Sequence, residues 1–126
     1  MLNKPLILIV DDDADLGKML DLILTEGGYR VQVAGGGADA LAWLEDHRPD
    51  LVLLDIMMPD MDGFTLLRQI RAHQATGQLP VVLITAFADH RTEAEGAHAG
   101  AHSLLRKPLR AEKLLDHIHR LLEHSG

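Results

Sequence analysis

The chain has 126 residues, of which 47% are hydrophobic, and a formal net charge of −7. This length suits one domain with its own core, so we expect a single domain over residues 1–126. No apolar run is long enough to cross a membrane. The apolar start of the chain is too short for a secretory signal, because aspartates follow directly at residue 11. Without cysteine, disulfides, thiolate metal sites and a thiol nucleophile are excluded. We therefore expect a cytoplasmic protein.

The negative charge argues against direct binding of nucleic acid, because a DNA-binding surface needs basic residues to displace counterions. The basic residues are scattered along the chain, whereas the acids cluster. One cluster is Asp11, Asp12 and Asp13, and a second lies between Asp55 and Asp62. These two acidic segments are the first candidates for chemistry.

Strand-like and helix-like patterns alternate along the whole chain. Short apolar or alternating runs predict five strands, at 5–10, 29–34, 51–54, 79–85 and 102–106. Apolar residues three and four positions apart predict five helices, at about 16–24, 38–47, 64–70, 89–99 and 114–122. Gly27 and Gly28 end the first helix, and Pro49 separates the second helix from the third strand.

Strands that are apolar throughout and alternate with helices indicate a parallel sheet covered on both faces. Because crossover connections are right-handed, the expected fold is a doubly wound, three-layer α/β sandwich. In such sheets, ligands bind beyond the carboxyl ends of the strands. The residues that end each strand are therefore the candidate functional residues.

Polar side chains end four of the predicted strands, namely Asp11 and Asp12, Asp55, Thr85 and Lys107. If these strands are neighbours, three carboxylates, a hydroxyl and an ammonium meet at one edge. The carboxylates repel one another, and Mg²⁺ would relieve this because it takes oxygen ligands and retains several waters. Asp55 would then be a nucleophile towards phosphorus, with Thr85 and Lys107 stabilising phosphoryl oxygens.

Four segments in this order resemble the receiver domain of bacterial response regulators, the CheY-like superfamily. They are ILIVDDD, LVLLDIMMPDMDG, PVVLITA and the KP of RKP, and they span essentially the whole chain. The resemblance implies a flavodoxin-like fold whose five parallel strands are ordered 2-1-3-4-5. It also implies that the protein works in a two-component phosphorelay.

For the site, the resemblance implies that Asp55 is the phosphoacceptor. Asp12 would ligate Mg²⁺ directly, Asp11 would act mostly through water, and the carbonyl of Met57 would be a further ligand. Mn²⁺ is expected to substitute for Mg²⁺.

The resemblance also assigns the remaining residues of the four segments. Thr85 would bond one phosphoryl oxygen and Lys107 another, and the Lys107–Pro108 peptide is expected to be cis. Pro59 and Gly63 would shape the loop that leads into the third helix.

The partners implied are a histidine kinase or a histidine phosphotransfer protein, docking at the start of the first helix near residues 13–18. The domain would transfer a phosphoryl group and catalyse its own dephosphorylation, so it is a signalling domain rather than a metabolic enzyme. A phosphorylation-dependent dimer is a further expectation. The output partner or output domain is not defined, since the receiver could stand alone or belong to a longer regulator or hybrid kinase.

Two other functions fit parts of the sequence. Gly35, Gly37 and Ala40 satisfy G-x-G-x-x-A between a strand and a helix, and Asp55 lies 20 residues after Gly35, as in a small dinucleotide-binding domain. Asp11-x-Asp13 resembles a phosphatase nucleophile motif, although such enzymes generally need a longer chain. The dinucleotide-binding alternative would leave the Asp pair after the first strand, Thr85 and Lys107 without a role.

Several conspicuous residues are interpreted as ordinary surface features. None of the eight histidines has convincing ligand geometry. Gly100 separates His98 from His102, and His117 and His119 face different sides of the last helix. Trp43 is expected to be a partly exposed aromatic, and Asp60 and Asp62 to be solvated acids.

The chain departs from the receiver pattern at Leu104, where the family usually carries Tyr or Phe. The preceding helix, at about 89–99, has no large aliphatic residue, and Gly96 should cost it about 1 kcal/mol relative to Ala. We therefore expect this helix to be the softest element, with switching by its ordering or displacement. Phe87 is expected to supply some of the missing bulk.

Overall fold

A computed structural model of the chain describes residues 4–87 and 89–124. Its strands are β1 (Leu6–Val10), β2 (Arg30–Ala34), β3 (Leu51–Asp55), β4 (Val81–Thr85) and β5 (Ser103–Arg106). Its helices are α1 (Ala14–Glu26), α2 (Gly37–Leu44), α3 (Gly63–Ala72), α4 (His90–Ala99) and α5 (Ala111–His124), and a short 3-10 turn, η1 (Gln74–Thr76), follows α3. The predicted order of strands and helices is confirmed, and η1 was not predicted.

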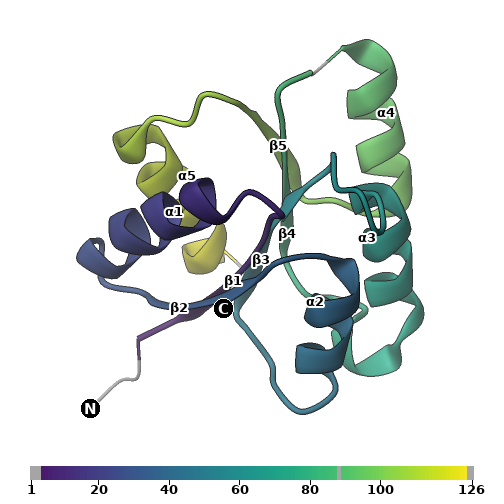
Figure 1. The fold of residues 1–126 in the computed structure, drawn as a ribbon, viewed down its shortest axis with the longest axis horizontal. Coiled ribbons are helices and arrows are strands. Elements are labelled where there is room, and N and C mark those ends of the chain that lie inside the picture. Colours follow the sequence, from purple (N-terminus) through teal and green to yellow (C-terminus); the bar gives the residue numbers. More distant parts are fainter. Residues whose placement is uncertain (1–3, 88, 125–126) are drawn as a thin grey trace.

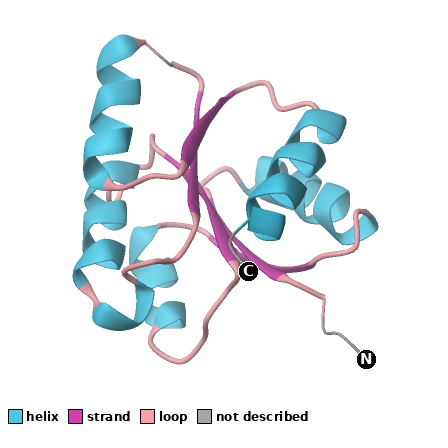
Figure 2. Ribbon diagram, turned by 180° about the vertical axis from the view of Figure 1, so that it is seen from behind, coloured by secondary structure: helices cyan, strands magenta, loops and turns pink. Residues whose placement is uncertain are grey.

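The five strands form one parallel sheet in the order β2-β1-β3-β4-β5, as expected (Figure 1). Helices α1 and α5 cover one face, and α2, α3 and α4 cover the other (Figures 1 and 2). The flavodoxin-like, doubly wound prediction is therefore confirmed.

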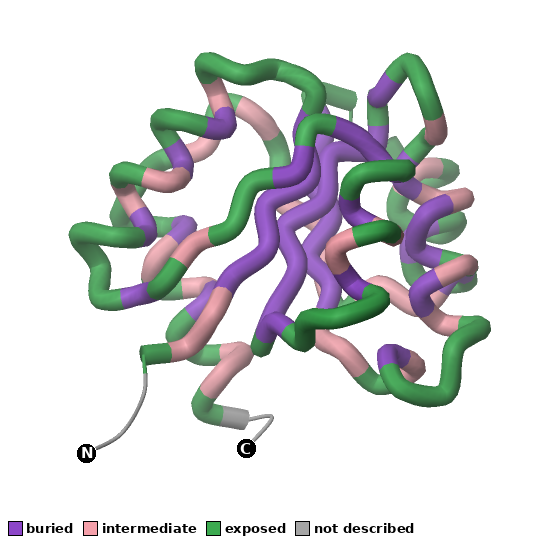
Figure 3. The backbone as a smooth tube through the Cα atoms, turned by 60° about the horizontal axis from the view of Figure 1, so that its bottom comes forward, coloured by how far each residue is buried: buried purple, intermediate pink, exposed green. Residues whose placement is uncertain are grey.

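The centre of the sheet is buried on both faces (Figure 3). Every residue of β3 and β4 is buried, because each strand has covered neighbours and helices on both sides. The edge strands β2 and β5 are more exposed. This burial explains the continuous apolar runs in the sequence and holds the ends of the central strands in fixed positions.

Helix α2 ends at Leu44, three residues earlier than the predicted His47. Two side chains form hydrogen bonds with carbonyl groups in its last turn. The ring of His47 bonds the carbonyl of Trp43 at 2.9 Å, and the guanidinium of Arg48 donates to the carbonyl of Leu44. Pro49 also disfavours a helical conformation at Arg48, so even a longer helix would have to end before that residue.

The aromatic and histidine predictions are mostly confirmed. Trp43 is half-buried and stacks on His47, with ring centroids 4.6 Å apart. His98, His102 and His119 are exposed. His117 is the correction: it is half-buried because α5 packs on β5, and its Nε2 lies 2.6 Å from the Ser103 hydroxyl.

In the described ranges 4–87 and 89–124, no helix combines the length and the apolar character needed to span a membrane.

Candidate functional site

The register of the sheet brings the predicted residues to one edge. Val10 is level with Leu54, Asp55 with Ile84, and Thr85 with Arg106, so the residues that follow these positions lie side by side. Asp11, Asp12 and Asp55 each offer a carboxylate oxygen within 4.8 Å of the others. The sequence prediction that three carboxylates meet here is confirmed.

Asp55 ends the buried strand β3 and is itself only 4% exposed. Its Oδ1 accepts a hydrogen bond from the amide of Met57 at 3.2 Å, and its Oδ2 lies 3.5 Å from the ammonium of Lys107. Gly63 passes so close behind it that an added Cβ would lie 2.7 Å from the Asp55 carbonyl oxygen. The carboxylate is therefore held by rigid strand on one side and tight loop on the other.

Asp11 is 2% exposed and its two oxygens have different surroundings. Oδ1 accepts from the amide of Asp13 at 2.9 Å. Oδ2 has no hydrogen-bond partner, although Lys107 Nζ lies 3.6 Å away, within ion-pair distance but too long for a hydrogen bond. A buried, unbonded carboxylate oxygen beside two further carboxylates is a donor set that suits a hard divalent cation.

The pKa of Asp55 is raised to about 6 in this environment. Burial is the main cause, and the negative charge of Asp11 adds to it. Lys107 and the amide of Met57 lower the pKa of Asp55 in part. One ammonium thus faces two buried carboxylates, and the site is short of positive charge.

Lys107 reaches this site from the end of β5. Its amide donates to the carbonyl of Thr85 at 2.8 Å, which links the ends of β4 and β5. The Lys107–Pro108 peptide is cis, as predicted.

Thr85 lies at the same edge and is buried, but its hydroxyl bonds within its own loop. It donates to the carbonyl of Phe87 at 3.0 Å and accepts from the amide of Phe87 at 3.0 Å. Phe87 is 73% exposed, so the expectation that it supplies some of the missing bulk is wrong. A ring that far exposed packs against little of the core.

The acids of the loop between β3 and α3 have partners that the sequence did not reveal. Asp60 accepts from the amides of Gly37 and Ala38 at 3.4 and 3.2 Å, at the start of α2. Asp62 caps α3 by accepting from the amide of Thr65 at 2.9 Å. Both acids are exposed, as expected, but they are capping residues rather than merely solvated ones.

These contacts weaken both alternative functions. In a dinucleotide-binding domain the start of α2 would hold a phosphate, whereas here the carboxylate of Asp60 lies there. The phosphatase alternative needs Asp13 beside Asp11. Asp13 instead caps α1, accepting from the amides of Asp15 and Leu16 at 3.0 and 3.2 Å.

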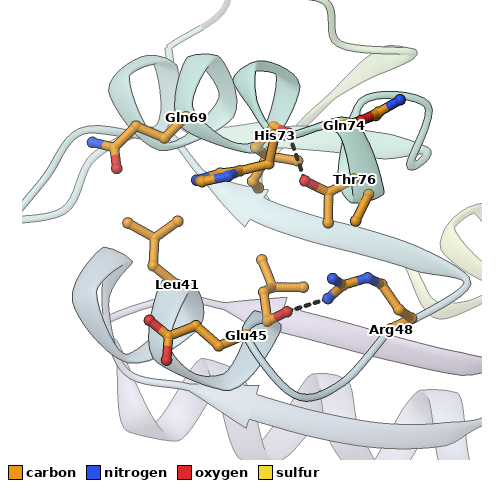
Figure 4. A pocket seen from close by; sticks show the side chains of 10 residues that line it. Leu41, Glu45, Arg48, Gln69, His73, Gln74 and Thr76 are labelled. Carbon is orange, nitrogen blue, oxygen red and sulfur yellow. Dashed lines mark hydrogen bonds between the residues drawn. The ribbon is translucent and has the colours of Figure 1, made fainter.

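A cavity of about 480 Å³ lies between the C-terminal parts of α2 and α3 (Figure 4). Leu41 and Arg48 line it on the side of α2, and Gln69 and His73 line it on the side of α3. None of the carboxylates at the strand ends lines it, so the cavity is not part of the acidic site.

Comparison with known proteins identifies the class to which this fold and site belong. The family described as response regulator receiver domain matches residues 7–119. The chain belongs to this family, as its four sequence segments indicated.

Particular relatives agree with this assignment. The chain is 37% identical over 123 residues to the transcriptional regulatory protein GltR of Pseudomonas aeruginosa, covering 98% of this chain and 51% of that protein. It is 39% identical over 121 residues to the transcriptional regulatory protein AfsQ1 of Streptomyces coelicolor, covering 96% and 52%. The chain thus spans about half the length of these curated relatives.

Solved structures show the same fold. A putative response regulator from Chloroflexus aurantiacus superposes with a TM-score of 0.91 at 35% identity, covering 96% of this chain and 99% of that one. The chemotaxis protein CheY4 of Vibrio cholerae gives a TM-score of 0.90 at 30% identity, covering 94% and 98%.

Proposed function

We propose that this chain is a phosphoacceptor receiver that takes a phosphoryl group on Asp55 from a histidine kinase or a histidine phosphotransfer protein. One observation carries this proposal: the buried Asp55 and Asp11 carboxylates share a single ammonium, with the Nζ of Lys107 3.5 and 3.6 Å away. Such a site is preorganised for added positive charge and for a group that carries oxygens.

Mg²⁺ would be held by Asp55 and Asp12, with Asp11 acting mostly through water and the carbonyl of Met57 as a further ligand. The buried Oδ2 of Asp11, which has no hydrogen-bond partner, supports this ligand set. When bound, the ion supplies the positive charge that offsets the carboxylates and the phosphoryl oxygens. Mn²⁺ takes the same oxygen ligands and would substitute for it.

The chain's own residues divide the remaining work. A carboxylate oxygen of Asp55 forms a bond to phosphorus as the bond between phosphorus and the donor histidine nitrogen breaks, which leaves an acyl phosphate on Asp55 and a neutral histidine. Lys107 moves its ammonium from the carboxylates to a phosphoryl oxygen, and Thr85 donates its hydroxyl hydrogen to another. Water later cleaves the acyl phosphate, releasing phosphate and restoring Asp55.

The proposal also covers the output of the receiver and its partners. The curated relatives are about twice as long as this chain, and several are described as DNA-binding or transcriptional regulators. We place the output of this receiver in protein contacts or in a domain outside residues 1–126, not in direct contact with nucleic acid. A kinase would dock near the start of α1, and a phosphorylation-dependent dimer is part of the same proposal.

The test uses acetyl phosphate with Mg²⁺ and detects the product as a mass increase or a gel shift. The wild-type chain should become phosphorylated, whereas Asp55→Asn should give no product because the amide is not a nucleophile. Asp62→Asn is the matched control, since it removes an exposed carboxylate from the same loop and keeps a capping oxygen. A phosphorylated product in Asp55→Asn would contradict the assignment.

Asp12→Ala separates the metal from the nucleophile. This variant should bind Mg²⁺ more weakly while Asp55 remains present. Unchanged Mg²⁺ affinity would show that Asp12 is not a ligand.

A further inference from the structure

The turn of three glycines, residues 35–37, has no role in the proposed phosphoryl transfer, yet it is fitted to a neighbour. A Cβ on Gly36 would lie 2.8 Å from Oδ2 of Asp60. A Cβ on Gly37 would lie 2.9 Å from both Cβ and Sδ of Met61. Real Cβ atoms do not approach other atoms this closely. Asp60 and Met61 can therefore pack against the turn only because its glycines have no side chains.

The contact is polar as well as steric. The amides of Gly37 and Ala38, in the first turn of α2, donate to the two carboxylate oxygens of Asp60 at 3.4 and 3.2 Å. These amides have no partner within the helix, and the helix dipole favours a negative charge beside them. Accordingly, these amide hydrogen bonds, chiefly that of Ala38, lower the pKa of Asp60.

Asp60 sits near the middle of the loop that joins β3 to α3. The neck of this loop is closed by the amide of Gly63, which donates to the carbonyl of Ile56 at 2.8 Å. At its start, Met57 is held through its amide to Asp55. The contact of Asp60 with the glycine turn fixes the middle of the loop against α2, a helix that otherwise shares no residue with the acidic site.

We propose that Asp60 is a positioning residue, whose carboxylate seats the loop in the glycine turn and thereby holds the Met57 carbonyl where it can ligate the cation. This inference rests on the proposed function, because it assumes that Met57 is a ligand. It assigns the G-x-G-x-x-A pattern a task in this chain: the glycines receive a side chain of the phosphoacceptor loop instead of a nucleotide.

The reason that such a contact affects metal affinity is preorganisation. A carbonyl on a loop that samples several positions must be ordered when the cation binds, and that ordering weakens binding. Groups that hold a ligand in place typically change metal affinity by about 10- to 100-fold, and Asp60 is further from the ion than such groups. We therefore expect about a 3- to 10-fold weaker Mg²⁺ affinity when the contact is lost.

The experiment measures Mg²⁺ dissociation constants of folded variants by calorimetry, without any phosphoryl donor. Asp60→Ala should weaken binding by that factor. Asp60→Asn should fall between the wild type and Asp60→Ala, because its single amide oxygen can still accept the bond from Ala38 but its NH₂ group cannot accept the second bond. Asp39→Ala is the matched control, since it removes a negative charge from the same first turn of α2, where Asp39 is exposed and distinct from the loop.

A second variant tests the contact from the other side. Gly36→Ala should displace the Asp60 carboxylate and weaken Mg²⁺ binding as Asp60→Ala does. The double variant should be no weaker than either single variant, because both remove the same contact. Fully additive losses, or an Asp60→Ala affinity equal to that of Asp39→Ala, would overturn the inference.

An NMR measurement distinguishes a positioning role of Asp60 from a general effect on the stability of the fold. In the wild type, Mg²⁺ should shift the amide signals of both Met57 and Ala38, whereas in Asp60→Ala the Ala38 signal should no longer respond. A persistent Ala38 response would contradict the coupling. If the wild type itself binds no Mg²⁺, or if Asp12→Ala has no effect, the proposed function fails; failure of the Asp60 variants alone leaves that function intact.

Discussion

Helices α1 and α4 make an instructive pair because they begin alike. Each follows a strand that ends at the acidic site, β1 for one and β4 for the other. Each has an aspartate as its N-cap, Asp13 and Asp89, and each ends at a glycine, Gly27 and Gly100. Gly100 has φ of 99°, a left-handed conformation that glycine adopts at little cost.

What the two helices bury is different. Helix α1 packs Leu20 and Leu24 fully into the core, whereas the buried residues of α4 are Gly96 and Ala99. A cavity of about 260 Å³ lies beside α4, lined in part by Leu104. Since stabilisation follows the apolar area that is buried, caps decide where a helix starts and ends, and large side chains decide how firmly it is held.

The largest expected effect tests that difference by substitution. Leu24→Ala should lower the free energy of unfolding by about 3 kcal/mol, because it removes a fully buried side chain and leaves a cavity. Ala99→Gly, which removes the one buried methyl that α4 offers, should cost about 1 kcal/mol. Urea unfolding measures both, and equal losses would show that α4 is anchored as firmly as α1.

The next effect concerns the acidic edge from which both helices start. The pKa of Asp55 is about 6 in the folded protein, above its ordinary value of 3.8, so the folded state is destabilised when this group is ionised. Asp55→Asn should therefore raise the free energy of unfolding by about 1–3 kcal/mol at pH 7.5 without Mg²⁺. The gain should shrink as the pH falls through 6 towards 4, where the wild-type carboxylate becomes protonated.

Urea unfolding at pH 7.5 and pH 4.5, with chelator present, measures this gain. Asp39→Asn, the same substitution at an exposed site outside the acidic edge, is the control. A variant at Asp55 that is less stable than the wild type at pH 7.5 would contradict the electrostatic account. The Asp55→Asn substitution should leave the difference between the stability losses of Leu24→Ala and Ala99→Gly unchanged. Asp55 lies at the edge from which both helices start, so its charge does not favour one helix over the other.

The smallest expected effect is local. Amide hydrogens of α4 should exchange at least about tenfold faster than those of α1, because opening α4 exposes little apolar surface. Adding Mg²⁺ and beryllofluoride should change the exchange of α4 more than that of α1. Hydrogen exchange measured by NMR decides this, and matching protection of the two helices in both states would refute the idea of a soft α4.

The sequence was sufficient for features that depend on position along a strand. Asp11, Asp55, Thr85 and Lys107 each follow a recognisable apolar run, and the carboxyl ends of parallel strands necessarily share an edge. The strand order came from the resemblance to receivers, and the structure confirms it.

Features that depend on contact between distant segments could not be predicted in this way. The bond from Ala38 to Asp60 joins residues 22 positions apart, and neither residue type signals the other. Gly96 was predicted only as a weak helix former. The structure shows that a Cβ there would lie 2.9 Å from Leu83, so its small size also lets α4 approach β4.

The bonds between Thr85 and Phe87 have a consequence for how the domain communicates. A threonine hydroxyl has one hydrogen, and here it is given to the carbonyl of Phe87. In the proposed function the same hydrogen is donated to a phosphoryl oxygen on Asp55, so the hydroxyl would have to release the carbonyl of Phe87 and the two arrangements exclude each other. A protein that binds the loop in its present form would therefore make phosphorylation of Asp55 less favourable. The equilibrium constant for phosphorylation would fall by the same factor by which phosphorylation lowers the affinity for that protein. Because Phe87 is exposed, a partner could contact this loop directly. Its affinity would then depend on the phosphorylation state of Asp55 without any contact with the carboxylates.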